Sequence, residues 1–265
     1  MRAVNTLSLV IPAYNEEARL PALLEILAAS ADAVIAAAGF ELLEMLIVDD
    51  GSCDRTRQIL AETSEPKLRP VLDHSENRGK GAAVGDGVLR AEGEYVLLAD
   101  VDLSTPLEEL PKLKAAIDAG ADLAIGSRAV RGAVVERGPV HRRLTGKVFG
   151  STVRALTGLE VRDSQNGFKL MPTAMAQELF AEQLCSGFAF DVELLMRAHI
   201  AGLRIAEVPV LYIHDARSRV RVAPASLQML RDVAMLSYRL RPRQAKRSAS
   251  ATGGWRGNLP ADDPD

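Results

Sequence analysis

Residues 96–106 have the sequence Val-Leu-Leu-Ala-Asp-Val-Asp-Leu-Ser-Thr-Pro, in which an apolar run ends in two aspartates separated by one residue. Side chains alternate between the two faces of an extended backbone, so we expect Asp100 and Asp102 on the same side. Two close carboxylates repel each other unless a positive charge lies between them. The stretch therefore predicts either a site for a hard divalent cation shared with phosphates or a solvated acidic turn after a strand.

Apolar runs and helical periodicity alternate on both sides of this stretch. The predicted strands are Leu7–Pro12, Leu42–Val48, Leu68–Leu72, Tyr95–Ala99 and Asp122–Gly126. The predicted helices between them are Glu16–Ala38, about ten residues from Asp54, Gly81–Ala91 and Leu107–Ala119. This alternation predicts an α/β fold, in which a mostly parallel sheet is flanked by helices.

The charge and the pattern of predicted elements change after residue 126. Residues 128–154 contain seven Arg and Lys residues and a single Glu. The predicted helices are Arg142–Leu156, Thr173–Phe180, Phe190–Ala201 and Ala225–Leu240, with a loop entering a short strand over Arg162–Leu170 and an extended segment over Arg204–Tyr212. Pro209 indicates an edge or a bend in that segment. Pro, Gly, Ser and charged residues dominate 241–265, which predicts a disordered tail.

Composition limits the class of protein. The chain of 265 residues is 48% hydrophobic and 25% charged, with a net charge of −3, which allows a sizeable core and gives no indication of nucleic-acid binding. Cys53 and Cys185 lack metal-ligand spacing, so we expect reduced thiols in a cytosolic protein. The N-terminus has no signal-peptide pattern, and acidic residues interrupt the apolar region 20–48, so we expect no membrane span.

Polar clusters follow three of the predicted strands directly. They are Pro12-Ala-Tyr-Asn-Glu16, Asp49-Asp50 and Asp100-Val-Asp102. In parallel sheets, ligands bind beyond the carboxyl ends of the strands. Three clusters at one edge favour a functional site over a solvated turn.

Several motifs are similar in order and spacing to those of family 2 glycosyltransferases with the GT-A fold. They are Ile11-Pro-Ala-Tyr-Asn-Glu-Glu17, Asp49-Asp-Gly-Ser-Cys-Asp54, Asn77-Arg-Gly-Lys-Gly-Ala-Ala83 and Ala99-Asp-Val-Asp102. Later motifs resemble the dolichyl-phosphate β-glucosyltransferase branch, to which the dolichyl-phosphate mannose synthases are close: Arg162-Asp-Ser-Gln-Asn-Gly-Phe-Lys169, Phe190-Asp-Val-Glu193 and Glu207-Val-Pro-Val210. The resemblance covers about residues 5–236.

This resemblance implies an inverting transfer of a hexose, most simply glucose from UDP-glucose, to a polyprenyl phosphate. It also implies a single GT-A domain over residues 1–240, with a nucleotide-binding half at about 1–126 and an acceptor half at 127–240. The implied contacts to the nucleotide sugar are Pro12, Tyr14, Glu16, Ile47, Asp49, Lys80, Asp100, Val101, Asp102 and Arg219.

Some of these residues have simpler interpretations. Asp49 can accept the ring N–H of uracil. Tyr14 is otherwise a packed loop aromatic, Glu16 an acid in a first helical turn and Asp54 a helix cap. The segment Gly79-Lys80-Gly81 precedes a helix, so its free amides and its lysine can face phosphate, although Lys80 is equally compatible with a solvated charge.

The metal ligands implied by the resemblance are Asp102 first and then Asp100, which either shares the ion or contacts the nucleotide or the sugar. The ion, Mg²⁺ or Mn²⁺, would act as a Lewis acid on the leaving diphosphate. Mannose synthase relatives carry a Gln two positions after the second Asp. Ser104 stands there in this chain, which leaves the third metal contact open.

The acceptor side of the predicted site is positively charged. A lipid phosphate is already an anion near neutral pH, so a strong general base is unnecessary. Positive charge to hold it is available from Arg128, Arg137, Arg142 and Arg143, which otherwise form a solvated basic face. Asp191 is a candidate base or sugar-hydroxyl ligand, or merely an acid at a helix start. Asp163, Gln165 and Lys169 belong to the signature without an assigned role.

Alternative functions keep the fold and change the chemistry. They are a GDP-mannose-dependent transferase, a transferase with a small soluble acceptor, and a non-catalytic partner subunit that binds nucleotide sugar. The basic segment and the C-terminal helix predict peripheral contact with the cytoplasmic face of a membrane. The apolar stripe of that helix can instead pack on the core or on a second subunit in a homodimer.

Overall fold

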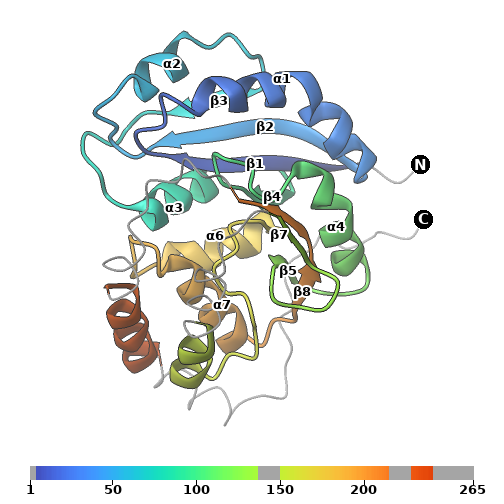
Figure 1. Cartoon of the computed structure of the whole chain (residues 1–265), viewed down its shortest axis with the longest axis vertical. Helices are drawn as coiled ribbons and strands as arrows, with labels where there is room; N and C mark the ends of the chain where they lie inside the picture. Colours follow the sequence, from blue (N-terminus) through green and yellow to red (C-terminus); the bar gives the residue numbers. More distant parts are fainter. Residues whose placement is uncertain (1–3, 137–149, 215–227, 241–265) are drawn as a thin grey trace, which may run out of the picture.

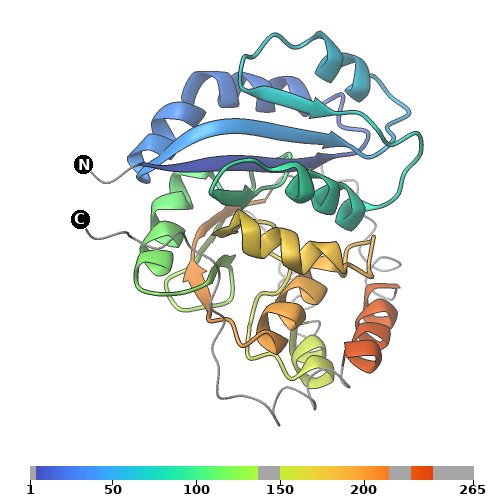
Figure 2. The same cartoon turned by 180° about the vertical axis from the view of Figure 1, so that it is seen from behind.

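A seven-stranded sheet forms the middle layer of the part of the chain that the structure describes, residues 4–136, 150–214 and 228–240 of a computed structural model (Figures 1 and 2). Its strand order is β3-β2-β1-β4-β7-β5-β8, and β6 pairs separately with β9. The strands are β1 (Asn5–Ala13), β2 (Phe40–Asp49), β3 (Leu68–Val71), β4 (Tyr95–Leu98), β5 (Leu123–Ser127), β6 (Val134–Glu136), β7 (Lys169–Pro172), β8 (Ile205–Pro209) and β9 (Leu211–Ile213).

Helices cover both faces of this sheet. They are α1 (Leu20–Ala37), α2 (Thr56–Glu62), α3 (Lys80–Arg90), the 3-10 turn η1 (Leu107–Glu109), α4 (Leu110–Asp118), α6 (Thr173–Ala181) and α7 (Phe190–Ile200). Residues 150–157 and 228–240 are also helical. The predicted α/β class and mostly parallel sheet are thus confirmed, with element bounds that differ by a few residues.

Alternating side chains of the parallel strands pack into two separate hydrophobic clusters. Leu7, Leu9 and Ile11 of β1 lie in the cluster that includes residues of α1, α2 and α4. Val10, between them, lies in the opposite cluster, with residues of α3, α6 and α7. Because both faces of a central parallel strand are covered, its sequence is apolar almost throughout, which is why these strands were recognisable as apolar runs.

One strand of the sheet runs against the others. β7 lies between β4 and β5 and is antiparallel to both. Lys169 of β7 pairs with Leu98 at the end of β4, so the residues just before β7 lie beside the Asp100 loop. The sequence predicted a short strand here but not its direction, because strand direction depends on the long connection and not on local pattern.

The extended segment predicted over Arg204–Tyr212 is two short strands. β8 pairs only with β5 in the described sheet and is its edge strand, ending at Pro209. β9 then pairs in parallel with β6. The predicted edge or bend at Pro209 is confirmed, because a proline cannot donate to a further strand.

Two helices with apolar stripes bury those stripes in the hydrophobic core. α1 is long and apolar enough by length and composition to cross a membrane, with a mean hydropathy of 1.8 over 18 residues. This corrects the expectation that acidic residues exclude such a stretch. Its stripe of Leu20, Leu23, Leu27, Ala31 and Ile35 is buried against the sheet. In residues 228–240, Val233 and Leu236 are likewise buried in the core.

Some sequence predictions fall on residues outside the described ranges. They are Arg137, Arg142, Arg143, Arg219, the tail 241–265, and the first residues of the helices predicted from Arg142 and Ala225. The two cysteines are described and are free thiols, as predicted, with Cys53 exposed and Cys185 buried.

We expect Gly87→Ala to lower the free energy of unfolding by about 1–3 kcal/mol, although alanine is the better helix former. A Cβ atom at residue 87 would lie 2.5 Å from Val10 Cγ1 and 3.1 Å from Val48 Cγ2, and both valines are buried. Urea denaturation measures the change. Leu89→Ala, on the exposed side of the same helix, is the control and is expected within about 0.5 kcal/mol of the native protein. Equal stability of the two variants would contradict this packing.

Candidate active site

The three polar clusters predicted at strand ends meet at one edge of the sheet. The backbone N–H of Asn15, after β1, donates to Ser52 Oγ, after β2, at 2.9 Å, and that of Cys53 donates back to Asn15 Oδ1 at 2.8 Å. Arg19, which follows the β1 cluster, lies 3.6 Å from Asp102, after β4. The structure therefore brings together residues that are about 85 positions apart in the chain.

Asp100 is held by a lysine from the start of α3. Lys80 Nζ donates to Asp100 Oδ1 at 2.7 Å, and the two side chains are 23% and 35% exposed. Burial alone would raise the pKa of Asp100, but the Lys80 ammonium more than offsets it and the pKa is lowered. Burial would likewise lower the pKa of Lys80, and Asp100 and Asp191 raise it instead. The pair is therefore fully ionised, and the alternative of Lys80 as a solvated charge is wrong.

Asp102 has one oxygen used inside its own loop. Its Oδ1 accepts the N–H of Ser104 at 3.0 Å, while Oδ2 lies 3.6 Å from Arg19 NH1. Arg19 also donates through Nε to Glu16 at 2.6 Å. Ser104 Oγ is buried and has no hydrogen-bond partner within the described ranges. Of the two Asp102 oxygens, Oδ2 is thus the one that accepts no described hydrogen bond.

Asp49 carries a buried carboxylate oxygen that is not hydrogen-bonded. Its Oδ1 accepts the N–H of Ser52 at 3.2 Å, whereas Oδ2 has no hydrogen-bond partner in the described part of the chain. Arg57 Nε, on a side chain that is 44% exposed, lies 3.9 Å from Oδ2. Unpaired buried carboxylate oxygens are costly, so this oxygen is suited to a donor from a ligand.

Two predicted contacts of the nucleotide sugar belong to the hydrophobic core. Ile47 has no exposed surface, and Val101 is 8% exposed; both pack in the cluster beneath α1. Both side chains therefore support the site by packing, and a contact of either residue with a nucleotide sugar would involve its backbone. Tyr14, by contrast, is 42% exposed, so it is not a packed loop aromatic.

Asp50, which the sequence placed in a polar cluster but not among the predicted site residues, organises the loop before α3. Its carboxylate accepts the backbone N–H groups of Arg78 at 2.9 Å and Gly79 at 2.8 Å, together with Asn77 Nδ2 at 2.9 Å. His74 Nδ1 lies 2.7 Å from the same carboxylate. Asp50 thus fixes the point at which Lys80 enters the site, and the doubling of aspartate after β2 was the available signal.

The amides before α3 are less available to phosphate than predicted. Gly79 N–H donates to Asp50, and Ala82 N–H donates to the carbonyl oxygen of Ser186 at 3.1 Å. Gly79 has a φ of +104°, and a Cβ there would lie 2.4 Å from that carbonyl oxygen. The prediction that the free amides of Gly79-Lys80-Gly81 face phosphate is therefore corrected for Gly79, and the amide of Ala82, the next residue along α3, is occupied as well. Asp54 accepts the N–H of Thr56, the first residue of α2, at 2.9 Å, but Arg55 occupies the N-cap position and no side-chain hydrogen bond caps this helix, so the interpretation of Asp54 as a helix cap is corrected.

Asp191 lies in a buried ion pair with Lys169. Their side chains are 3% and 0% exposed, and Lys169 Nζ also donates to the carbonyl oxygen of Asn166. Burial raises the pKa of Asp191, and the ammonium groups of Lys169 and Lys80 offset it only in part. Lys169, a residue of the signature without an assigned role, is the cation that permits a carboxylate at this depth.

Arg128 is held in a fork by Asp163. Its Nε and NH2 groups donate to the two Asp163 oxygens at 2.7 Å each, and its guanidinium lies 4.8 Å from the Tyr212 ring centre. Burial would raise the pKa of Asp163, but Arg128 more than offsets it and the pKa is lowered. Glu207 accepts the N–H groups of Arg162 and Asp163 and fixes that loop. Arg128 is thus positioned, with 32% of its side chain exposed.

The carboxylates of the site fit a divalent cation that also binds a ligand. No group of three or more His, Cys, Asp or Glu residues suited to a metal ion occurs among the residues that the structure places. Mg²⁺ and similar ions, however, are commonly bound by one or two carboxylates together with phosphate oxygens and waters. Asp102 with Asp100 supplies this oxygen-only donor set.

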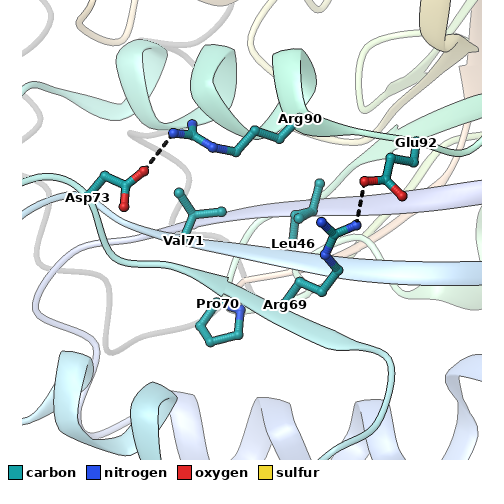
Figure 3. A pocket seen from close by; sticks show the side chains of 7 residues that line it. All are labelled: Leu46, Arg69, Pro70, Val71, Asp73, Arg90 and Glu92. Atoms are coloured by element: carbon teal, nitrogen blue, oxygen red, sulfur yellow. Dashed lines mark hydrogen bonds and ion pairs between the residues drawn. The ribbon is translucent and has the colours of Figure 1, made fainter.

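A surface pocket of about 430 Å³ lies elsewhere, at the edge strand β3 and the C-terminal end of α3 (Figure 3). Its two arginines face acids, with Arg69 2.9 Å from Glu92 and Arg90 2.6 Å from Asp73. The charges around this pocket are thus already paired, and it contains none of the strand-end residues.

A mostly parallel sheet with these carboxylates at one edge is the arrangement predicted for a glycosyltransferase with the GT-A fold. The model of glycosyl transferase family 2 matches residues 8–180, and the chain belongs to this family.

Curated relatives agree over most of the chain. The dolichyl-phosphate beta-glucosyltransferase of Drosophila melanogaster is 35% identical over 244 residues, covering 88% of this chain and 74% of the relative. The enzyme of the same name from Homo sapiens is 31% identical and covers 94% of this chain and 77% of the relative.

Solved structures show the same fold. Glucosyl-3-phosphoglycerate synthase from Mycobacterium tuberculosis in complex with UDP has a TM-score of 0.62 at 21% identity, covering 88% of this chain and 80% of that chain. Its complex with Mn²⁺, UDP-glucose and phosphoglyceric acid has a TM-score of 0.60 at 19% identity, with the same coverage of both chains. These likenesses confirm the predicted GT-A fold.

We expect Gly167→Ala to lower the rate of glycosyl transfer at least tenfold without unfolding the protein. A Cβ on Gly167 would lie 2.4–2.6 Å from the Asp100 carboxylate oxygens, so that carboxylate must move. A displacement of about 1 Å can cost about 10²-fold in rate. Gly187→Ala, whose Cβ would meet nothing within 4 Å, is the matched control for both activity and thermal midpoint. Native activity in Gly167→Ala would show that the position of Asp100 is unimportant.

Proposed function

We propose that the protein transfers glucose from UDP-glucose to a polyprenyl phosphate, with inversion at the anomeric carbon and with a divalent metal ion. The observation that carries this proposal is the assembly of Asp49, Lys80, Asp100 and Asp102 at the carboxyl edge of the sheet. The two relatives named above, 31% and 35% identical over 94% and 88% of this chain, support the choice of glucose and of a dolichyl-type acceptor.

On the donor side, the unpaired Oδ2 of Asp49 accepts the ring N–H of uracil. Arg57 lies near this oxygen on a half-exposed side chain, which is free to turn aside as the base enters. Pro12 and Tyr14 flank Ala13, which pairs with Asp49 in the sheet, and Glu16 is held by Arg19. Arg219, outside the described residues, would add positive charge near the diphosphate, since arginine keeps the charge of the lysine usual in relatives.

Asp102, with Asp100, would hold the metal ion, Mg²⁺ or Mn²⁺. When bound, such an ion supplies Lewis-acid stabilisation to the diphosphate as it departs. Asp100 remains paired with Lys80, whose ammonium adds a second positive charge on the side of the leaving group. The two charges lower the cost of separating a diphosphate from the sugar.

On the acceptor side, the phosphate of a polyprenyl phosphate is already ionised and needs no strong base. Arg128, held by Asp163 and partly exposed, attracts this anion; Arg137, Arg142 and Arg143 would complete the positive surface. Asp191, kept in place by Lys169, is the carboxylate that would accept a hydrogen bond from a sugar hydroxyl if the bound sugar reaches this buried position. The attacking phosphate oxygen forms the new bond to the anomeric carbon as the bond to the diphosphate breaks.

We further propose peripheral attachment at the cytoplasmic face of a membrane, because the acceptor is a lipid. In helical residues 228–240, Tyr238 is 81% exposed and Met235 is 36% exposed, and Arg231 and Arg239 are exposed as well. An exposed apolar surface beside basic side chains suits an anionic lipid surface. A homodimer through the same surface is the alternative, and sedimentation with vesicles separates the two.

The test is an assay with short polyprenyl phosphates, Mg²⁺ or Mn²⁺, and either UDP-glucose or GDP-mannose. We expect glucolipid from UDP-glucose only. Asp102→Asn should lower its formation by at least about 10²-fold, because the metal loses its main protein ligand, while the thermal midpoint stays near the native value. Lys112→Met, which removes an exposed lysine paired with Glu109, is the control for a lost surface charge.

Other products decide between the alternatives. Formation of mannolipid from GDP-mannose would show that GDP-mannose, and not UDP-glucose, is the donor. Transfer to 3-phosphoglycerate in place of the lipid would show that the acceptor is a small soluble molecule. No transfer from either nucleotide sugar to either acceptor would contradict the proposed function.

A further inference from the structure

Arg19 lies between two carboxylates that come from different strand ends. Its Nε donates to Glu16 Oε2 at 2.6 Å, and its NH2 group donates to Glu16 Oε1. Its NH1 group lies 3.6 Å from Asp102 Oδ2. The three side chains are only 12–17% exposed, so these charges interact with little screening by water.

With Arg19 included, each aspartate of the Asp100-Val-Asp102 pair has a cation of its own. Lys80 lies 2.7 Å from Asp100, and Arg19 lies 3.6 Å from Asp102. The repulsion expected between two close carboxylates is therefore relieved by side chains of the protein itself. The two cations come from different elements, since Lys80 begins α3 and Arg19 directly precedes α1.

Arg19 faces the same carboxylate oxygen that a metal ion would use. Asp102 Oδ1 accepts the Ser104 N–H, so Oδ2 is the oxygen better placed for a cation. A guanidinium and a divalent ion beside one carboxylate oxygen repel each other. A nucleotide diphosphate changes this balance, because its oxygens can bind both positive groups at once.

We propose that Arg19 is a positioning residue that holds Asp102 and Glu16 in the free enzyme and competes with the metal ion for Asp102 until the nucleotide arrives. This inference rests on the proposed metal-assisted donor site. Under this proposal, the affinity of the protein for the metal ion depends on the nucleotide. The ion binds weakly to the free enzyme and tightly once the diphosphate also contacts Arg19.

The side chain of Arg19 can be changed without removing a helix cap. The residue occupies the N-cap position of α1, and no side-chain hydrogen bond caps this helix. Arg19→Met removes the charge and keeps an unbranched apolar stem. Arg19→Lys keeps the charge and loses the two-pronged contact with Glu16.

The experiment titrates Mn²⁺ into the full chain, with and without UDP, and follows free Mn²⁺ by electron paramagnetic resonance. Without UDP, Arg19→Met should bind Mn²⁺ about threefold to tenfold more tightly than the native protein, because a nearby positive charge is gone. The gain in Mn²⁺ affinity caused by UDP should shrink. Arg19→Lys should keep Mn²⁺ affinity within about twofold of native and bind UDP less tightly.

Arg90→Met is the matched control, because it also removes one arginine paired with an aspartate, in the pocket at the far end of α3 (Figure 3). It should leave Mn²⁺ affinity unchanged. Unchanged or weaker Mn²⁺ binding by folded Arg19→Met, as judged by its thermal midpoint, would overturn the inference. A native protein that binds no Mn²⁺ even with UDP would instead overturn the proposed metal-assisted function.

Discussion

The ion pair between Lys80 and Asp100 joins the start of α3 to the end of β4 at the centre of the site. Both residues sit where the fold places them with little freedom. Asp50 fixes the loop that delivers Lys80, and Gly167 leaves room for Asp100 because any Cβ there would meet its carboxylate. The antiparallel strand β7 in turn places Gly167, since Lys169 pairs with Leu98 at the end of β4. Sheet topology and site electrostatics therefore depend on one another at this point.

The charged side chains of the site form pairs of one cation and one carboxylate. Lys80 faces Asp100, Lys169 faces Asp191, and Arg128 faces Asp163. Buried or half-buried ions are tolerated only in such pairs, because each unpaired charge would lose its hydration without compensation. A reaction that brings together a diphosphate and a second phosphate needs positive groups on both sides of the sugar. The arrangement supplies them from separate elements and keeps each one oriented before a ligand binds.

Local sequence pattern predicted most of the fold and the core of the site. Apolar runs ending in polar clusters located β1, β2 and β4, because a strand buried on both faces leaves little choice of residue. The direction of β7 and the role of Asp50 were not predictable in this way, since both depend on contacts between distant segments. Ile47 and Val101 show another limit of sequence pattern: their position beside the aspartates did not reveal that their side chains are buried in the core. Arg19 was missed because its partner Asp102 lies far along the chain.

We infer that Lys80 and Asp100 act as one unit in binding the donor. A double-mutant cycle with Lys80→Met, Asp100→Asn and the double variant tests it, with the dissociation constant of UDP measured by calorimetry in the presence of Mn²⁺. We expect the double variant to lose much less affinity than the sum of the two single losses, with a coupling free energy of at least about 1.4 kcal/mol. Losses that add to within about 0.5 kcal/mol would contradict it.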